Sequence, residues 1–243
     1  MAPQHRALSV LLTRPAAQAD RFAAELVKRF GTRLHPCISP LMVPEFFSPE
    51  WPDEPYSTLI LTSETGAEAA ARLRDLGHVL PEKAICVGDR TAEIARGLGF
   101  DARSAKGDAE ALIAVILGSD DRGPFLHLRG REARGDIAPR LAAKGRPAHS
   151  AIVYAQVAQP LTAEAQDLLA GHDPVIIPLF SPRSAAILAD FGPFAAPLLL
   201  AALSPAVAEK AAALAPARLV VADLPDAAGM LTAIDVLIAD RAS

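Results

Sequence analysis

The sequence predicts an α/β protein with two similar halves, each a mostly parallel β-sheet with helices on both faces. Short apolar runs of strand length alternate with Ala-rich stretches that favour helix, as in βα units. Three such units occur twice in the same order, which indicates two similar domains. The two halves are separated by segments that read as crossing strands, so we expect one domain to be inserted in the other.

The clearest unit runs from Leu59 to Leu73 and reads LILTSETGAEAAARL. Its apolar strand ends at Thr62 and Ser63, and a helix begins at once. The first N–H groups of a helix have no partner within that helix. They form a site for an anion such as a carboxylate or phosphate, or one of the two hydroxyl side chains simply caps the helix. On this stretch alone, both interpretations stay open.

The same unit recurs in the second half, where VIIPLFSPRSAAIL places Ser181 before an Ala-rich helix. Pro182 suits the first position of that helix, because its missing N–H would have had no partner there. Further strand–turn–helix units follow each copy; they begin at Ile85 and Lys106 in the first half and at Leu199 and Asp223 in the second. Each half therefore repeats one βα pattern.

The N-terminal segment predicts a strand, a helix and a second strand. We expect the first strand over Leu8–Thr13 and the helix over Ala16–Phe30, with Gly31 at its C-terminus. The second strand, Arg33–Ile38, contains Pro36, which is typical of a strand at the edge of a sheet.

The middle of the chain contains the two expected crossings. Ser39–Tyr56 holds five prolines and the lone Trp51, a composition that favours a crossing segment over a packed element. Later, a strand over Pro124–Gly130 and a helix over about Gly135–Lys144 lead to the alternating strand Ala151–Ala158. That last strand is the expected return crossing, with Tyr154 and Val153 on opposite faces.

These segments give explicit domain boundaries. Residues 1–37 and 159–243 form the first, discontinuous domain, and residues 41–153 form the inserted one. Residues 38–40 and 154–158 are the linker strands. Ligands of parallel sheets bind at the carboxyl ends of the strands, where Thr62, Gly88, Arg129 and Ser181 fall. Facing sheets would place these ends along a cleft between the domains.

Composition excludes several function classes. The net charge of −4 and the 5% aromatic content argue against a nucleic-acid partner. No apolar window has the ~18 residues of a membrane span, and no signal-peptide pattern appears at the N-terminus. Cys37 and Cys86 read as buried free thiols, so a cytoplasmic location is expected. The cysteines and histidines show no metal-ligand spacing.

The order of the motifs resembles one enzyme family, the uroporphyrinogen-III synthases, over nearly the whole chain. The segments that carry the resemblance are LLTRP, LILTSETGAEAA, ICVGDRTAEIARGLGF, FLHLRGREARGDIAPRLAAKG, AIVYAQVAQPL, VIIPLFSPRSA and LPDAAGMLTAI. The resemblance implies two flavodoxin-like three-layer domains with parallel sheets, joined by a two-stranded β linker. It also implies an active site in the interdomain cleft, with neither a metal nor an organic cofactor.

The implied reaction is the dehydrative cyclisation of hydroxymethylbilane, a linear octacarboxylate tetrapyrrole, with inversion of ring D to give uroporphyrinogen III. Such an enzyme works by positioning a flexible substrate and controlling a cationic azafulvene. The resemblance further implies a monomer that acts on a small molecule, with hand-over from hydroxymethylbilane synthase and no nucleic-acid or membrane partner.

The resemblance also assigns roles to individual residues. Tyr154 matches a tyrosine proposed to assist departure of the substrate hydroxyl; the alternative is a half-buried strand tyrosine with no chemical role. The other matches are expected to hold the substrate, mainly through its carboxylates, by hydroxyl, backbone N–H and guanidinium groups: Arg14, Thr62, Ser63, Gly88, Thr91, Arg129, Gly130 and Ser181.

Two turns depart from the family pattern. Leu203–Val207 lacks the glycine and the threonines of the second-domain turn, and Glu64 puts a negative charge beside an expected anion site. These departures keep open a catalytically degenerate relative that acts as a tetrapyrrole- or anion-binding sensor or partner module. A two-lobed binding protein of the periplasmic type is a third interpretation, against which the lack of a signal-peptide pattern argues.

Overall fold

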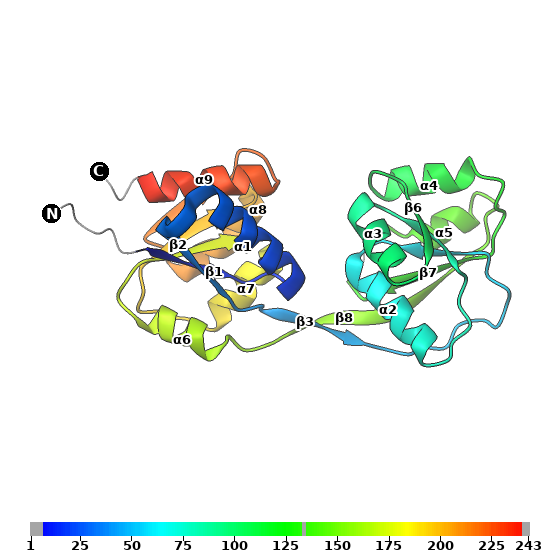
Figure 1. Ribbon diagram of the computed structural model, residues 1–243, viewed down its shortest axis with the longest axis horizontal. Helices are drawn as coiled ribbons and strands as arrows, with labels where there is room; N and C mark the ends of the chain where they lie inside the picture. Colours follow the sequence, from blue (N-terminus) through cyan, green and yellow to red (C-terminus); the bar gives the residue numbers. More distant parts are fainter. Residues whose placement is uncertain (1–6, 133–134, 240–243) are drawn as a thin grey trace. The chain divides into compact units, whose positions relative to one another are not determined.

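A computed structural model describes residues 7–132 and 135–239 of the chain (Figure 1). The chain divides into two compact units: unit 1 comprises Met1–Val43 and Ala158–Ser243, and unit 2 comprises Pro44–Val157. Unit 2 is therefore inserted in the sequence of unit 1. The linker strands predicted at 38–40 and 154–158 lie at or within a few residues of these divisions.

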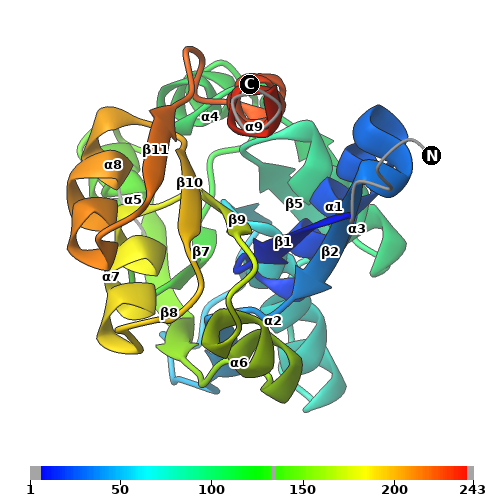
Figure 2. The same ribbon diagram turned by 90° about the vertical axis from the view of Figure 1, so that its left-hand side faces the viewer.

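Unit 1 contains a parallel sheet with strand order β11-β10-β9-β1-β2 (Figure 2). The strands are β1 (Leu8–Leu12), β2 (Leu34–Ile38), β9 (Val175–Leu179), β10 (Leu198–Ala202) and β11 (Arg218–Val221). β2, which contains Pro36, lies at an edge of this sheet as predicted, because an edge strand tolerates the missing N–H.

Helices cover both faces of this sheet. On one face, α1 (Ala16–Phe30) and α9 (Ala227–Ala239) pack against Val10 and Leu12. On the other face, α6 (Ala163–Ala170), α7 (Pro182–Asp190) and α8 (Pro205–Ala211) pack against Leu11. Short 3₁₀ helices, η1 (Gly31–Arg33) and η2 (Ala212–Leu214), follow α1 and α8. Successive β1 residues point to opposite faces, so an uninterrupted apolar strand serves both layers.

Unit 2 has the strand order β3-β8-β7-β4-β5-β6. Its strands are β3 (Met42–Phe46), β4 (Thr58–Leu61), β5 (Lys83–Cys86), β6 (Asp101–Ser104), β7 (Phe125–Gly130) and β8 (Ala148–Ala158). The strands from β8 to β6 pair in parallel. β3 and β8, at the two chain crossings between the units, are neighbours in the sheet.

This second sheet is also covered on both faces. The helices α2 (Glu64–Asp75) and α3 (Asp89–Gly97) pack against Leu59 and Leu61. The helices α4 (Ala109–Leu117) and α5 (Ile137–Ala142) pack against Ile60 and Phe125 on the other face. The predicted α/β class, with parallel sheets in two halves, is confirmed.

The proline-rich segment 39–56 differs from the sequence prediction. It contains β3 at the edge of the unit 2 sheet, and Pro44 is tolerated there. Trp51 packs against the core, with its ring centroid 5.0 Å from that of His78. The prediction that this segment contains no packed element is therefore wrong.

None of the helices in the described residues combines the length and the hydrophobicity needed to span a bilayer.

Candidate active site

A cavity of about 390 Å³ lies at the carboxyl end of the unit 2 sheet. It is the place where parallel strands present loop residues and helix N-termini to a ligand. Four of its lining residues were predicted as site residues from the sequence: Thr62, Ser63, Gly130 and Tyr154. The other lining residues were not predicted from the sequence: Val87, Asp108, Ala109, Glu132, Ile137 and Gln156.

Tyr154 is the most distinctive group in the cavity wall. Its side chain is only 9% exposed, and its hydroxyl oxygen lies 2.9 Å from Oγ of Ser63. Burial raises the pKa of Tyr154; the hydrogen bond with Ser63 opposes this shift, while the carboxylates of Glu132 and Glu68 add to it. The phenol is therefore protonated at neutral pH and is able to donate a hydrogen bond or a proton.

Ser63 fixes the start of helix α2. Its Oγ accepts the backbone N–H of Gly66 at 2.9 Å, so Ser63 is the N-cap. The cap interpretation of the LILTSETGAEAA turn is thus realised in the structure, and the same oxygen also contacts Tyr154. Glu64, the charge that departs from the family pattern, lies 3.9 Å from the guanidinium of Arg90, which partly offsets its charge near the helix start.

An irregularity in strand pairing sets the direction of Tyr154. Arg129 pairs with Ile152, but the next β7 residue, Gly130, pairs with Tyr154, so the register skips Val153. Val153 and Tyr154 both belong to one buried cluster. The strict alternation predicted for Ala151–Ala158 is therefore wrong at this point. Bulges of this kind redirect a side chain relative to a regular strand.

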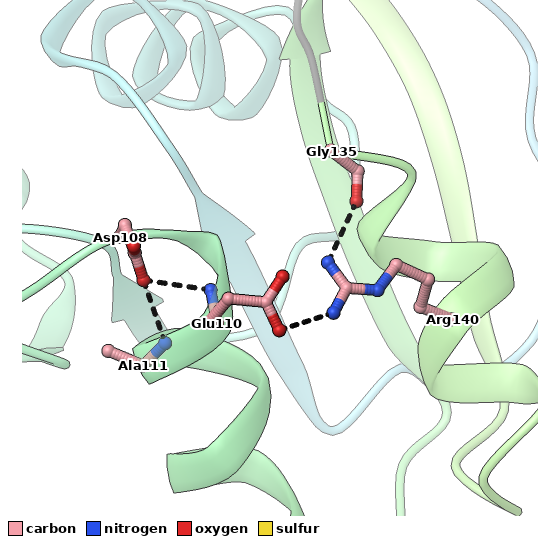
Figure 3. A network of polar contacts seen from close by, with 5 residues as sticks. All are labelled: Asp108, Glu110, Ala111, Gly135 and Arg140. Atoms are coloured by element: carbon pink, nitrogen blue, oxygen red, sulfur yellow. Dashed lines mark hydrogen bonds and ion pairs between the residues drawn. The ribbon is translucent and has the colours of Figure 1, made fainter.

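Two carboxylates border the same cavity. Asp108 caps α4: its Oδ1 accepts the N–H groups of Glu110 and Ala111 at 3.0 and 3.1 Å (Figure 3). Glu110 in turn pairs with Arg140 of α5, which joins the two helices beside the cavity. Glu132 accepts the backbone N–H of Gln156 at 3.4 Å. None of the described residues that line this cavity is a lysine or an arginine.

The remaining predicted residues of unit 2 lie outside the cavity lining. Gly88 is the N-cap of α3, and a Cβ added there would meet no atom within 4 Å. The structure thus gives no steric reason for glycine at position 88. Thr91 is buried in α3. Arg129 directs its guanidinium to the carbonyl oxygen of Gly130 at 3.2 Å.

Arg14 and Ser181 belong to unit 1, at the carboxyl ends of the neighbouring strands β1 and β9. The Arg14 guanidinium stacks on the ring of Phe180, 4.0 Å from its centroid, and donates to Gln18 at 3.0 Å. Ser181 caps α7 by accepting the N–H of Ser184 at 3.0 Å. Both residues therefore lie at the carboxyl ends of strands of the unit 1 sheet, as the sequence predicts.

Within the described residues, no group of three or more His, Cys, Asp or Glu side chains is arranged to hold a metal ion. Cys37 and Cys86 are free and buried, and burial raises the pKa of each thiol to about 11. Neither cysteine lines the cavity.

The parallel sheets, and a cavity at the carboxyl ends of one of them, define an α/β protein with a cavity where proteins of this class bind small molecules. The profile of the family described as Uroporphyrinogen-III synthase HemD matches residues 22–232, most of the chain. The chain belongs to the uroporphyrinogen-III synthase family. This membership places it among the enzymes of porphyrin biosynthesis.

Two of the solved structures that align with this chain come from Helicobacter pylori and Thermus thermophilus. The uroporphyrinogen-III synthetase of Helicobacter pylori aligns with a TM-score of 0.63 at 16% identity, over 95% of this chain and 99% of that one. A mutant uroporphyrinogen III synthase of Thermus thermophilus aligns with a TM-score of 0.46 at 14% identity, over 96% and 100% of the two chains. A search of curated proteins found no match. The first of these structures supports the fold described above.

Proposed function

We propose that this chain is an active uroporphyrinogen-III synthase, which closes hydroxymethylbilane to uroporphyrinogen III with loss of water and inversion of ring D. Family membership supports the activity. The observation that carries the assignment of the site is the buried Tyr154 hydroxyl, held 2.9 Å from Ser63 in a cavity at the strand ends.

In this proposal the hydroxymethyl carbon of the substrate occupies the cavity. The phenol of Tyr154 donates its proton to the hydroxyl, the C–O bond breaks and water leaves. The electron pair of the pyrrole nitrogen forms the new double bond, which gives a cationic azafulvene.

The azafulvene carbon bonds to the already substituted α-carbon of ring D, which gives a spirocyclic intermediate. The bond from that α-carbon to the methylene of ring C then breaks, and the methylene bonds to the free α-carbon of ring D, so the ring is inverted. The proton that this free α-carbon loses restores the phenol. The phenol carries the proton that this step needs at neutral pH, and the hydrogen bond with Ser63, which lowers the pKa of Tyr154, favours its transfer.

The charge of the cavity wall supports this placement of the reacting carbon. Asp108 and Glu132 bring negative charge to the wall, and fixed negative charge stabilises a cation that develops beside it. Such a wall suits the azafulvene better than it suits the substrate carboxylates.

The substrate carboxylates are assigned to other groups. We keep Gly88, Thr91 and Arg129 in unit 2, and Arg14 and Ser181 in unit 1, as proposed contacts on the strength of the family resemblance. Thr62 and Ser63 offer hydroxyl groups at the cavity wall itself. Guanidinium groups suit this task because their planar donors match a carboxylate.

One observation favours a second candidate, a degenerate relative that binds a tetrapyrrole without closing it. Ser204 begins α8, but its side chain makes no capping hydrogen bond, and the turn that follows reads Pro205-Ala206-Val207. This turn offers a ligand fewer hydroxyl groups than the family pattern does.

A coupled assay separates the two candidates. Hydroxymethylbilane is generated in situ, and the oxidised products are separated into type I and type III porphyrin isomers. Without a synthase the substrate closes spontaneously to type I, so predominantly type III product is the expected result. Purely type I product from the folded protein would contradict the proposed activity and favour the degenerate binder.

A further inference from the structure

We propose that Gly130 is a positioning residue for Tyr154: its missing side chain leaves the space that the phenol ring occupies. This inference rests on the proposed function for its catalytic consequence. It changes the role of Gly130 from a substrate contact to a residue that acts through another side chain.

The first observation is the contact itself. A Cβ built on Gly130 would lie 2.6 Å from Cζ, 2.8 Å from the hydroxyl oxygen and 2.9 Å from Cε2 of Tyr154. These atoms form the reactive end of the ring, and real Cβ atoms do not approach other atoms so closely. Any side chain at position 130 would therefore displace the hydroxyl.

The backbone supplies no competing reason for glycine. Gly130 is the last residue of β7 and is not among the residues with positive φ, the region that glycine enters most easily. Its neighbour across the sheet is Tyr154, after the register shift at Val153. The N–H of Arg131 donates to the carbonyl of Tyr154 at 2.9 Å, which holds the two strands together beside the contact.

A second close approach fixes the position of Ser63, the hydrogen-bond partner of the phenol. A Cβ added to Gly66 would lie 3.1 Å from Oγ of Ser63 and 3.3 Å from the carbonyl oxygen of Leu128 in β7. The start of α2 therefore packs tightly on the strand that carries Gly130. Because Ser63 caps this helix, its hydroxyl has a fixed place relative to β7. The Tyr154 ring that reaches Ser63 lies over Gly130.

Gly130→Ala is a selective test, because the atoms it would strike are the far end of a side chain and can move. We expect the variant to fold, to lose the Ser63–Tyr154 hydrogen bond and to lower kcat by ~10-fold or more, with KM within about twofold of wild type. The control is Gly97→Ala in α3, where a Cβ would meet no atom within 4 Å.

A double-mutant cycle in the coupled assay decides whether Gly130 acts through the hydroxyl. The four proteins are wild type, Gly130→Ala, Tyr154→Phe and the double variant. If Gly130 positions the hydroxyl, alanine at position 130 costs little more once that hydroxyl is gone. Independent effects that multiply in the double variant, or a Gly130→Ala variant with wild-type kcat, would overturn the proposal.

A spectroscopic experiment tests the contact between Gly130 and Tyr154 without any measurement of enzyme activity. The chain has two tyrosines, so a Tyr56→Phe background leaves Tyr154 as the one phenol in an ultraviolet titration. Burial raises the pKa of Tyr154 and the hydrogen bond with Ser63 lowers it, and displacement of the hydroxyl in Gly130→Ala changes both, so that pKa should shift. An unchanged pKa would contradict the positioning role. If wild type makes only type I porphyrin, the proposed function fails while this titration still tests Gly130.

Discussion

The hydroxyl oxygen of Tyr154 lies 2.9 Å from Oγ of Ser63, and the same Oγ accepts the N–H of Gly66 at the start of α2. Ser63 thus connects the N-terminus of α2 to the phenol of Tyr154. Tyr154 belongs to β8, which lies two strands from β4 in the sheet. A change at Ser63 has two separable consequences, one for the stability of the helix and one for the acidity of the phenol.

We predict that Ser63→Ala lowers the free energy of unfolding by about 1 kcal/mol, because a serine N-cap is lost. It should also raise the pKa of Tyr154, since the hydrogen bond that lowers this pKa disappears, and slow the formation of type III porphyrin. Chemical denaturation and the ultraviolet titration in the Tyr56→Phe background measure the two effects.

The matched control is Thr162→Ala. Thr162 caps α6 by accepting the N–H of Ala165 at 3.3 Å, so this change should cost similar stability and leave the pKa of Tyr154 unaltered. If both variants leave that pKa unchanged, the contact between Ser63 and Tyr154 has no electrostatic effect and our account of the site is wrong.

Glu132→Gln should lower the pKa of Tyr154. The carboxylate of Glu132 disfavours the phenolate, and the amide keeps the size of the side chain while it removes the charge. The same titration measures the shift, with Glu82→Gln as a control at an exposed position just before β5. Equal pKa values in the two variants would argue that Glu132 does not act on the phenol.

Arg129→Ala should raise KM several-fold and leave kcat nearly unchanged. A contact to a substrate carboxylate made equally in the ground and transition states affects binding alone. Initial rates over a range of hydroxymethylbilane concentrations measure both constants. Arg122→Ala, at an exposed position before β7, is the control; a KM for Arg129→Ala equal to that of the control would remove Arg129 from the substrate contacts.

His127 should make the protein sensitive to mild acid. Its side chain is 2% exposed in β7, and burial, with a smaller effect of Arg129, lowers its pKa from 6.5 to about 4. Between these two values the unfolded chain binds a proton that the folded protein does not. The contribution of the neutral imidazole to the free energy of unfolding is therefore fully present above about pH 6.5. It is lost as the pH falls towards 4, and the loss is on the order of 3 kcal/mol.

Denaturation curves at about pH 7 and about pH 4.5 for wild type and His127→Gln measure this effect. The variant has no imidazole, so its stability should fall less over this interval than that of wild type. A parallel fall in both proteins, or an imidazole that titrates near 6.5 by nuclear magnetic resonance, would show that His127 is not the acid-sensitive group.

The sequence predicted the elements that follow from periodicity and capping. The helix Ala16–Phe30 has the predicted bounds, and Ser63 and Ser181 cap helices where the strand–turn–helix pattern placed them. These features depend on neighbours in the sequence, so local composition is sufficient to find them.

Features that depend on pairing between strands were not predicted. The bulge at Val153 is invisible in an alternating sequence, because it is defined by what lies across the sheet. Asp108 and Glu132 look like ordinary loop residues until the strand ends come together. Ligands of parallel sheets bind at the carboxyl ends of the strands. If every residue that follows a parallel strand had been considered on this ground, Asp108 and Glu132 would both have been candidates. The role of Gly130 could not be predicted either, because it depends on where the Tyr154 ring lies in the folded protein.

One comparison of two variants tests most directly whether the Tyr154 hydroxyl promotes the loss of water from the substrate. Type III porphyrin formation is measured for Tyr154→Phe and Tyr56→Phe in the coupled assay. Tyr56 donates to the carbonyl of Pro52 and lies outside the cavity lining. We expect Tyr154→Phe to fold and to lower kcat by ~100-fold or more, while Tyr56→Phe keeps wild-type activity. A Tyr154→Phe variant as active as Tyr56→Phe would contradict the account.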